Sequence, residues 1–281
     1  MAKLEIVHCA ELALREVSGL CVRRGDRGSE ILAIGDEDFT VMVLAVDGDA
    51  VGDRVRRVDV RSLFAGVGKK RGGSQWEAVA ADADGRALVL QENPGTVFVL
   101  SPALDTLAST VALDANESVL ARGWEDDENS RGEGMIALSN GHLLIVKEKR
   151  PALLVEFGPR GAQAGGVRPE LLVPAPFVPR ADSFVPLAAW AIEDGPEDLS
   201  DAAVSPAGHL YLLSDAERCL LQLDADLRPA AEAIRPSARW ELPKKIKKPE
   251  GLAFLPNRSP VVACDRDDEG IAIFVLEPIG A

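Results

Sequence analysis

Apolar residues in this chain fall in short runs separated by turn residues, a pattern that indicates strands rather than helices. No segment of useful length has helical periodicity, and strands do not alternate with helices. Five segments share one pattern, in which a polar or acidic residue leads into a short apolar strand. They begin at Ser18, Glu77, Glu133, Asp201 and Glu250, at intervals of 59, 56, 68 and 49 residues. The chain therefore contains five repeats of one structural unit.

Each repeat continues through a tight turn into further strands. Glycine marks the turn at Gly85, Gly141 and Gly208, where a hairpin needs positive φ. The second strands are predicted at Ile31–Ile34, Ala87–Leu90, Leu143–Val146, Leu210–Leu213 and Val261–Ala263. The third strands are predicted at Thr40–Ala45, Thr96–Leu100, Ala152–Phe157, Cys219–Leu223 and Ile271–Leu276. Weaker fourth strands are predicted at Arg54–Val60, Thr106–Leu113, Leu187–Ile192 and Arg239–Leu242. Repeated four-stranded sheets that pack radially form a propeller, so we predict an all-β fold, a five-bladed β-propeller with antiparallel blades.

The two ends of the chain are predicted to close the ring. The last repeat runs out of residues after its third strand, whereas the strand Leu4–His8 precedes the first repeat. We expect this N-terminal strand to complete the last blade. The segments near 114–131 and 158–186 are interpreted as loop insertions within one domain of residues 1–281.

Acidic residues recur at two fixed positions of the repeat. The first residue of the inner strand is acidic in four repeats and is Ser18 in the first. A second acid follows each second strand, at Asp36, Glu92, Glu148, Asp215 and Asp265, which is 18, 15, 15, 14 and 15 residues after the first position. Antiparallel neighbours bring these two positions to the same face, so the side chains are expected to surround one mouth of the central channel.

Carboxylates this close repel one another unless a cation, a proton or a basic side chain offsets them. Oxygen ligands without His or Cys favour a hard cation, Ca²⁺ before Mg²⁺. The predicted metal ligands are Glu77, Glu133, Asp201, Glu250, Asp36, Glu92, Glu148, Asp215 and Asp265. Alternatively, some of these acids cap turns or accept hydrogen bonds from the backbone of the neighbouring blade.

Basic residues gather at the same predicted mouth. Eight of the nine lysines fall in three loops there, at Lys69, Lys70, Lys147, Lys149, Lys244, Lys245, Lys247 and Lys248. One interpretation is charge balance between exposed pairs. The other is a collar that draws an anionic ligand onto a central cation, with Lys69, Lys70, Arg131, Lys147, Lys149, Lys247 and Lys248 as its anion-binding residues.

Composition excludes several other classes of function. The formal net charge of −14 argues against nucleic-acid binding, because such a chain repels phosphate backbones. No apolar run is long enough to cross a membrane, and no leader is recognisable, so we expect a cytoplasmic monomer. The four cysteines form no zinc-binding pattern. His142 and His209 begin second strands, away from the acids, which disfavours a catalytic triad and a zinc site.

The blade motifs resemble those of the SdiA-regulated (YjiK-type) propellers and of the wider phytase-like and gluconolactonase-like group. The resemblance rests on REVSGLCV (15–22), ILAIGDEDFTVMVL (31–44), QWEAVA (75–80), RGEGMIAL (131–138) and KKPEGLAF (247–254). It implies a propeller with calcium at the channel mouth. The matching positions are Glu77, Glu133, Asp201 and Glu250, with Ser18 replacing an acid in the first blade.

Three functions follow as hypotheses. The first is a Ca²⁺-binding propeller that recognises an anionic small molecule or acidic peptide at its channel mouth. The second is a Ca²⁺-dependent esterase, phosphatase or lactonase-type hydrolase, in which the metal polarises the substrate and a carboxylate, with Glu133 as candidate, activates water. The third is an interaction scaffold without metal.

Overall fold

The strands of the described part of the chain form four β-sheets. The computed structural model describes residues 2–25, 27–48, 50–64, 73–115, 118–121, 123–124, 131–224, 226–266 and 270–280. The innermost strands are β3 (Val17–Gly25), β7 (Trp76–Ala81), β11 (Gly132–Ala137), β15 (Asp201–Val204) and β20 (Pro249–Phe254). The second strands are β4 (Gly28–Gly35), β8 (Ala87–Gln91), β12 (Leu143–Lys147), β16 (Leu210–Ser214) and β21 (Pro260–Cys264). The third strands are β5 (Thr40–Asp47), β9 (Thr96–Leu100), β13 (Leu153–Pro159), β17 (Cys219–Leu223) and β22 (Gly270–Leu276).

The outer strands are β6 (Ala50–Asp59), β10 (Leu107–Leu113), β14 (Ser183–Ile192), β19 (Pro236–Glu241) and β2 (Ile6–Leu12). The short elements are β1 (Ala2–Lys3), β18 (Ala233–Ile234) and the 3-10 helices η1 (Arg61–Phe64), η2 (Val119–Ala121) and η3 (Pro169–Leu171). The strands predicted from the apolar pattern are thus present, with ends shifted by a few residues. Among the described residues, no helix has the length and apolar character needed to span a bilayer.

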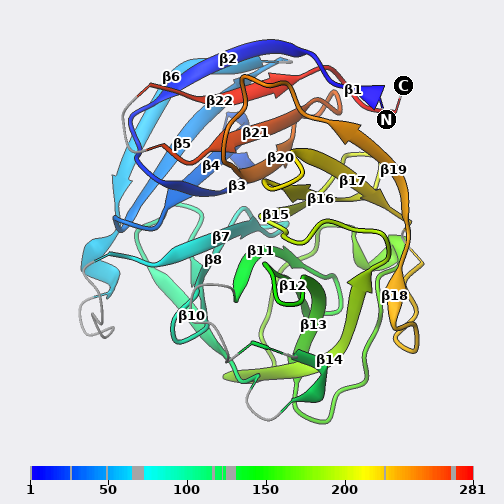
Figure 1. Ribbon diagram of the computed structural model, residues 1–281. Coiled ribbons are helices and arrows are strands. Elements are labelled where there is room, and N and C mark those ends of the chain that lie inside the picture. The colour runs from blue at the N-terminus through cyan, green and yellow to red at the C-terminus, as the bar shows by residue number, and fades with distance from the viewer. Residues whose placement is uncertain are drawn as a thin grey trace.

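The innermost strands form a closed ring. Strand β3 packs on β7, β7 on β11, β11 on β15, β15 on β20, and β20 returns to β3. Figure 1 views this ring with the inner strands at the centre and the outer strands at the rim. Inner strands around a channel and outer strands at the periphery are the arrangement of a β-propeller.

The division of the strands into sheets differs from the prediction of one separate sheet per repeat. Strands β7 to β14 belong to a single nine-stranded sheet, while the remaining strands form sheets of four, four and five strands. The join is a short parallel pairing of β10 with β14, in which Ala112 lies opposite Ser183 and Leu113 opposite Phe184. This pairing depends on the path of the 158–186 insertion, which the repeat pattern does not encode.

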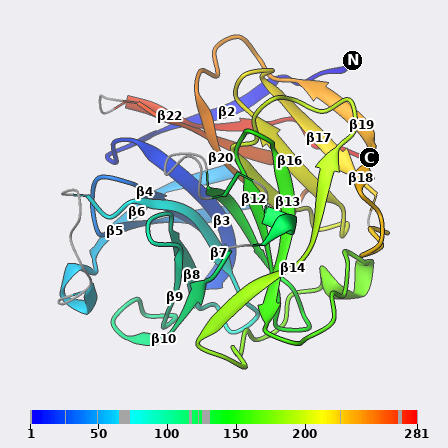
Figure 2. The same cartoon turned by 60° about the horizontal axis from the view of Figure 1, so that its bottom comes forward.

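The N-terminal strand completes the last sheet, as the sequence predicts. Strand β2 pairs antiparallel with β22, although its residues are Ile6–Leu12 rather than the predicted Leu4–His8. Figures 1 and 2 show the blue N-terminal strand alongside the red C-terminal strand. Residues from the two ends of the chain therefore hydrogen-bond within one sheet and close the ring.

Apolar side chains fill the spaces between neighbouring sheets. Strands β8, β12, β16 and β21 are buried along their whole length, because sheets cover both of their faces. This explains their continuous apolar sequences. One layer contains Trp76, which stacks edge-on against Phe39 and Phe64 and is completely buried.

The 158–186 insertion packs against the far ends of the innermost strands and is more than a surface loop. Its Leu172 and Pro174 line a small apolar cavity of about 150 Å³ together with inner-strand residues such as Cys21, Met135 and Leu252. The backbone N–H of Phe177 donates to Asp82. The far end of the channel therefore ends in an apolar cavity.

Candidate functional site

Four of the five innermost strands begin with a β-bulge. Each pairing register shifts by one residue across the bulge, so the residue at its centre has no direct partner on the second strand. The bulged residues are Ser18, Glu77, Glu133 and Glu250. A bulge re-aims a side chain away from the regular alternation of a strand. The repeated acids therefore have a local backbone cause that turns them towards the mouth.

A repeated backbone hydrogen bond fixes each bulge. The N–H of the acid after the second strand donates to the carbonyl two residues before the bulged residue. The four pairs are Asp36 to Glu16, Glu92 to Gln75, Glu148 to Arg131 and Asp265 to Lys248, at 3.4, 3.0, 3.2 and 2.9 Å. Glu16, Gln75 and Lys248 adopt positive φ angles of 46°, 54° and 46°. Such angles cost non-glycine residues about 1–2 kcal/mol each, so strain is concentrated at this mouth.

The fourth repeat differs from the alignment based on sequence. Asp201 pairs directly with Leu213, two residues before Asp215. That is the register of Gly19, Ala78, Gly134 and Gly251 in the other repeats. Ser200, not Asp201, therefore occupies the position of the bulged residues. The interval from Ser200 to Asp215 is 15 residues, which matches three other repeats, and this regularity is the signal that the sequence reading missed.

Asp201 lies inside the channel and holds neighbouring inner strands together. One carboxylate oxygen accepts a hydrogen bond from the N–H of Ala202 at 2.7 Å, and the other accepts from the N–H of Leu252 at 2.6 Å. Its side chain fits because Gly134 is adjacent, where an added Cβ would lie 2.9 Å from the carboxylate. Burial raises the pKa of Asp201 well above its ordinary value, and the backbone N–H donors oppose that rise.

The three bulged glutamates interact electrostatically across the channel. Burial, followed by the charge of Glu92, raises the pKa of Glu77 well above its ordinary value. Burial and then Glu77 do the same to the pKa of Glu133. The pKa of Glu250 rises to about 8 through burial and then the charge of Asp215, although a hydrogen bond with Ser200 opposes the rise. Side chains from three different repeats thus share one weakly solvated space.

The acids after the second strands form a second level around the glutamates. Burial, followed by a hydrogen bond with Glu16, raises the pKa of Asp36 to about 7. Burial and then Asp198 raise the pKa of Asp215. Glu92 is buried, and its carboxylate accepts a hydrogen bond from the N–H of Arg131 at 3.1 Å. Glu92 thus accepts a hydrogen bond from the backbone of the next repeat, which is the alternative role considered for these acids.

Asp198 is a further acid at this mouth that the repeat pattern did not identify. Its carboxylate accepts hydrogen bonds from the Ser214 hydroxyl at 2.6 Å and from the N–H of Ala216 at 3.0 Å. It bridges to Lys149 through the backbone. It lies two residues before Ser200, a position occupied by Glu16 in the first repeat and by Gln75, Arg131 and Lys248 in the others, so no recurrence of acids marks it.

Two observations bear on whether a cation fits. Oδ1 of Asp36 and Oδ1 of Asp265 are buried without a hydrogen-bond partner, so each retains acceptor capacity. The candidate metal-ligand atoms of these acids are all oxygens, as a hard cation requires. Among the described residues, however, no three acidic, His or Cys side chains converge in ligating geometry. The residues present match a hard cation in chemistry, and binding one would require the carboxylates to move closer together.

The basic residues of the predicted collar have different environments. Lys149 pairs with Glu148 at 2.6 Å, and Lys248 pairs with Asp265 at 3.0 Å. Lys147 is completely buried, and its ammonium donates to the Lys149 carbonyl. Nε of the buried Arg131 donates to the Trp124 carbonyl at 3.1 Å. Charge balance therefore accounts for part of the collar.

The exposed Lys247 has a different neighbourhood. It lines an open groove of about 740 Å³ together with Lys245, Lys248, Arg266 and the apolar Ile271 and Phe274. Lys69 and Lys70 of the predicted collar lie outside the described residues. Four cysteines are present as free thiols, and burial raises the pKa of Cys21 and Cys219 to about 12, which makes both unreactive.

Comparison with known proteins identifies relatives. A family model described as SdiA-regulated matches residues 69–258. No curated protein matches the chain. Glutaminyl cyclase from Myxococcus xanthus has a similar structure, with a TM-score of 0.57 and 14% identity over 98% of this chain and 95% of that chain. The calcium-binding protein regucalcin from Agrobacterium tumefaciens has a TM-score of 0.51 and 13% identity over 99% and 95%. The PQQ-bound aldose sugar dehydrogenase of Streptomyces coelicolor has a TM-score of 0.51 and 9% identity over 98% of both chains. At such low identity these structures support the propeller fold alone.

Proposed function

This chain belongs to the SdiA-regulated family, and we propose that it is a cation-binding β-propeller whose channel mouth recognises an anionic ligand. The cation is Ca²⁺ in preference to Mg²⁺, because a crowd of flexible carboxylates suits the larger ion, whereas Mg²⁺ demands strict octahedral geometry. A structural neighbour, the regucalcin of A. tumefaciens, is described as a calcium-binding protein, which supports this choice.

One observation carries the proposal. Glu77, Glu133 and Glu250 come from three repeats, are turned to one channel by equivalent bulges, and resist ionisation because of burial and mutual repulsion. A divalent cation removes that repulsion, and the gain in free energy contributes to its binding. The unpartnered oxygens of Asp36 and Asp265 add ligands at the next level.

The remaining predicted acids are assigned by their contacts. Both oxygens of Asp201 accept backbone hydrogen bonds, and Glu92 accepts one from Arg131, so we assign both to holding inner strands and loops in place. Glu148 and Asp215 lie beside basic residues and adjust the charge of the mouth.

The anionic ligand would contact the cation and the lysine groove beside it. Lys245, Lys247 and Lys248 surround that groove, and Ile271 and Phe274 provide an apolar wall. A phosphate or carboxylate group could accept charge-assisted hydrogen bonds there while its remaining atoms pack on the wall. A small phosphorylated polyol has the required chemistry.

We also propose that the ring has five blades. The nine-stranded sheet divides into two four-stranded units at the β10–β14 pairing, with β18 as an appended strand. Five separate hydrophobic clusters lie between consecutive units, as expected for five blades packed in a ring.

Isothermal titration calorimetry of the metal-free protein with Ca²⁺ tests the proposal. We expect one binding event that Glu77→Gln or Glu133→Gln weakens at least about tenfold, because each removes a charged ligand. Glu170→Gln, on an exposed residue of the 158–186 insertion, is the matched control and should bind as the wild type does. Inositol monophosphate should then bind only with Ca²⁺ present. Absence of heat with both titrants would leave the scaffold hypothesis in place.

A second candidate function is a Ca²⁺-dependent hydrolase of esters, phosphomonoesters or lactones. It is favoured by carboxyl groups with pKa values near neutrality, about 7 for Asp36 and about 8 for Glu250, which suit proton transfer at physiological pH. Assays with nitrophenyl esters, nitrophenyl phosphate and simple lactones distinguish the two functions. Turnover that Glu133→Gln abolishes would support the hydrolase, whereas Ca²⁺ binding without turnover would support recognition alone.

A further inference from the structure

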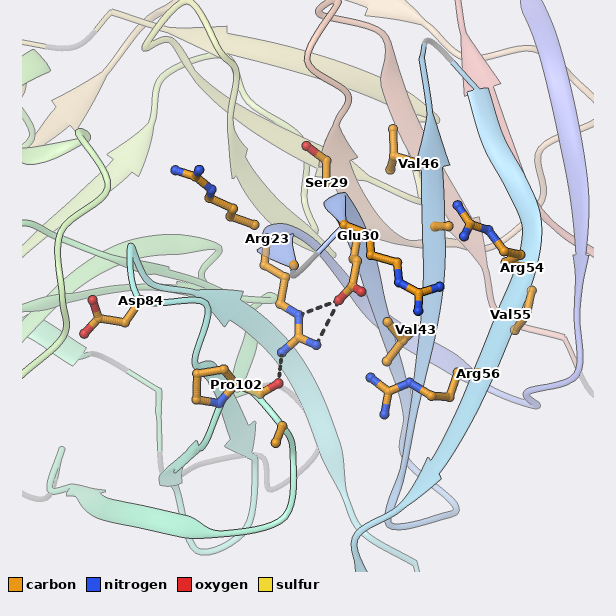
Figure 3. Close-up of a pocket in the computed structure, with 15 residues that line it drawn as sticks. Arg23, Ser29, Glu30, Val43, Val46, Arg54, Val55, Arg56, Asp84 and Pro102 are labelled. Atoms are coloured by element: carbon orange, nitrogen blue, oxygen red, sulfur yellow. Dashed lines mark hydrogen bonds and ion pairs between the residues drawn. The ribbon is translucent and has the colours of Figure 1, made fainter.

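An arginine-rich groove lies on the first sheet, away from the carboxylate mouth. It occupies about 840 Å³ and is lined by residues 23–25, 27, 29 and 30 of the β3–β4 hairpin, by β5 and β6, and by Asp84, Pro102 and Ala103. The hairpin is at the opposite end of β3 from Ser18, so this groove is separate from the carboxylate mouth. Figure 3 shows Arg54 and Arg56 on one side of the groove and the Arg23–Glu30 pair on the other.

The groove carries four arginines whose charges are not neutralised by the described part of the protein. Arg24, Arg27, Arg54 and Arg56 are exposed, line the groove and have no ion-pair or hydrogen-bond partner among the residues that the structure describes. Both acids among the described lining residues are already engaged, since Glu30 pairs with Arg23 at 2.9 Å and Asp84 with Arg86 at 3.5 Å. A positive patch of this kind is unexpected in a chain with a net charge of −14.

The base of the groove is rigidly built. Arg23 is buried, and its guanidinium donates to the carbonyls of Gly85 and Pro102 at 3.0 and 2.8 Å, as well as to Glu30. Glu30 and Pro102 line the groove, and Gly85 lies in the adjoining turn between β7 and β8. The position of the β3–β4 hairpin relative to strands β7 to β10 is therefore fixed. The exposed arginines consequently need little rearrangement to receive a ligand.

The surface between the arginines is apolar. Val43 and Val46 of β5, Val55 of β6 and Pro102 contribute to the lining. Val55 is one of the few large hydrophobic residues with an exposed side chain, at 45%. A small inorganic anion would leave this surface uncovered. A ligand that alternates carboxylates with apolar side chains would pair with the guanidinium groups and cover the valines.

We propose that this groove binds an acidic peptide segment of a partner protein, with carboxylates on the four arginines and apolar side chains on the floor. Arginine suits this role because its planar guanidinium binds carboxylates with two parallel hydrogen bonds. A nucleic acid fits less well, because the net charge of −14 repels a long phosphate backbone outside the groove. Arginines on the outermost strand also discourage edge-to-edge pairing, but that role does not account for Arg24 and Arg27 on the hairpin.

Fluorescence anisotropy of a labelled peptide of alternating Glu and Val tests the proposal. We expect the full-length protein to bind it and to ignore the matched peptide with Lys in place of Glu. Arg54→Glu combined with Arg56→Glu should weaken binding at least about tenfold, and rising salt should weaken it further. A second variant, Arg24→Gln with Arg27→Gln, should also weaken binding, which guards against a folding defect in β6.

The control variant carries Arg168→Glu with Arg180→Glu. It makes the same change in net charge on exposed arginines outside the groove and should bind the peptide as the wild type does. Equal weakening by control and groove variants would overturn the proposal, because it would reveal a non-specific charge effect. Tighter binding of tripolyphosphate or of a single-stranded oligonucleotide than of the peptide would also overturn it.

Discussion

At the scale of single residues, the channel is governed by which positions can hold a side chain. Gly19, Gly134 and Gly251 lie where inner strands approach closely, and a Cβ at any of them would contact the neighbouring strand at 3.1 Å or less. The fourth repeat places Asp201 in that register and uses the space beside Gly134. The sequence could predict that an acid was there, but not that a one-residue shift turned it inwards, because only strand pairing defines the register.

Replacing Asp201 is predicted to lower stability rather than only ligand affinity. Asp201→Ala leaves the N–H groups of Ala202 and Leu252 without their acceptors inside the channel. Each unsatisfied buried group costs about 1–3 kcal/mol, so the loss of two acceptors should lower the free energy of unfolding by about 2–6 kcal/mol in urea titrations. Asp53→Ala, on an exposed residue of β6, is the control and should be close to neutral. A neutral Asp201→Ala would contradict the assigned role.

At the scale of elements, the sequence predicts strands well and their joins poorly. Continuous apolar runs identify β8, β12, β16 and β21 because both faces of these strands are buried. The parallel contact of β10 with β14 has no such signature, since it depends on where the 158–186 insertion returns to the sheet. The same insertion supplies Leu172 and Pro174 to the far end of the channel, which its Pro- and Gly-rich sequence did not indicate.

Removing β2 is predicted to open the ring. Deletion of residues 2–12 would leave β22 as an unpaired edge and expose apolar side chains that Leu12 now covers. We expect a large fall in melting temperature by differential scanning calorimetry, together with aggregation through the free edge. A synthetic peptide of residues 2–12 should restore much of the loss.

Single substitutions in β2 separate packing from pairing. Leu12 is 2% exposed and Val7 is 59% exposed, so Leu12→Ala should lower the melting temperature and Val7→Ala should not. An unchanged melting temperature after deletion of the whole strand would show that β2 is dispensable for ring closure.

At the scale of the whole molecule, charge is divided between two regions. The carboxylate mouth repels itself, whereas the arginine groove on the first sheet is positive, so an acidic chain presents surfaces of opposite sign. The repeat pattern revealed the mouth because its acids recur at fixed intervals. The repeat pattern could not reveal the groove. Its arginines lie on one hairpin and one outer strand, and they do not recur at equivalent positions of the other repeats.

The charge of the mouth makes the stability of the whole protein depend on pH and on calcium. The pKa values of Glu250 and Asp36, about 8 and about 7 in the folded protein, lie above their ordinary values of 4.5 and 3.8. At a pH between the ordinary pKa and the folded pKa of each group, the folded state therefore keeps a proton that the unfolded state has released. The stability contributed by the protonated groups is complete below the ordinary pKa and is lost as the pH rises towards the folded pKa. Without metal, the melting temperature should be several degrees lower at about pH 8 than at about pH 5.5.

Calcium should reverse this loss, because the cation replaces the protons as the partner of the carboxylates and binds only the folded state. The expected result is a melting temperature that rises with Ca²⁺ concentration at the higher pH and changes much less at the lower pH, where protons compete for the same oxygens. A variant with Asp36→Asn, Glu77→Gln and Glu250→Gln should show a smaller difference in melting temperature between the two pH values than the wild type and ignore Ca²⁺, while Glu133, Asp201 and Asp215 still titrate. If this variant kept the pH dependence of the wild type, the titrating groups would lie elsewhere in the protein. If only its calcium response were lost, the mouth would bind the cation without controlling the stability of the apo-protein.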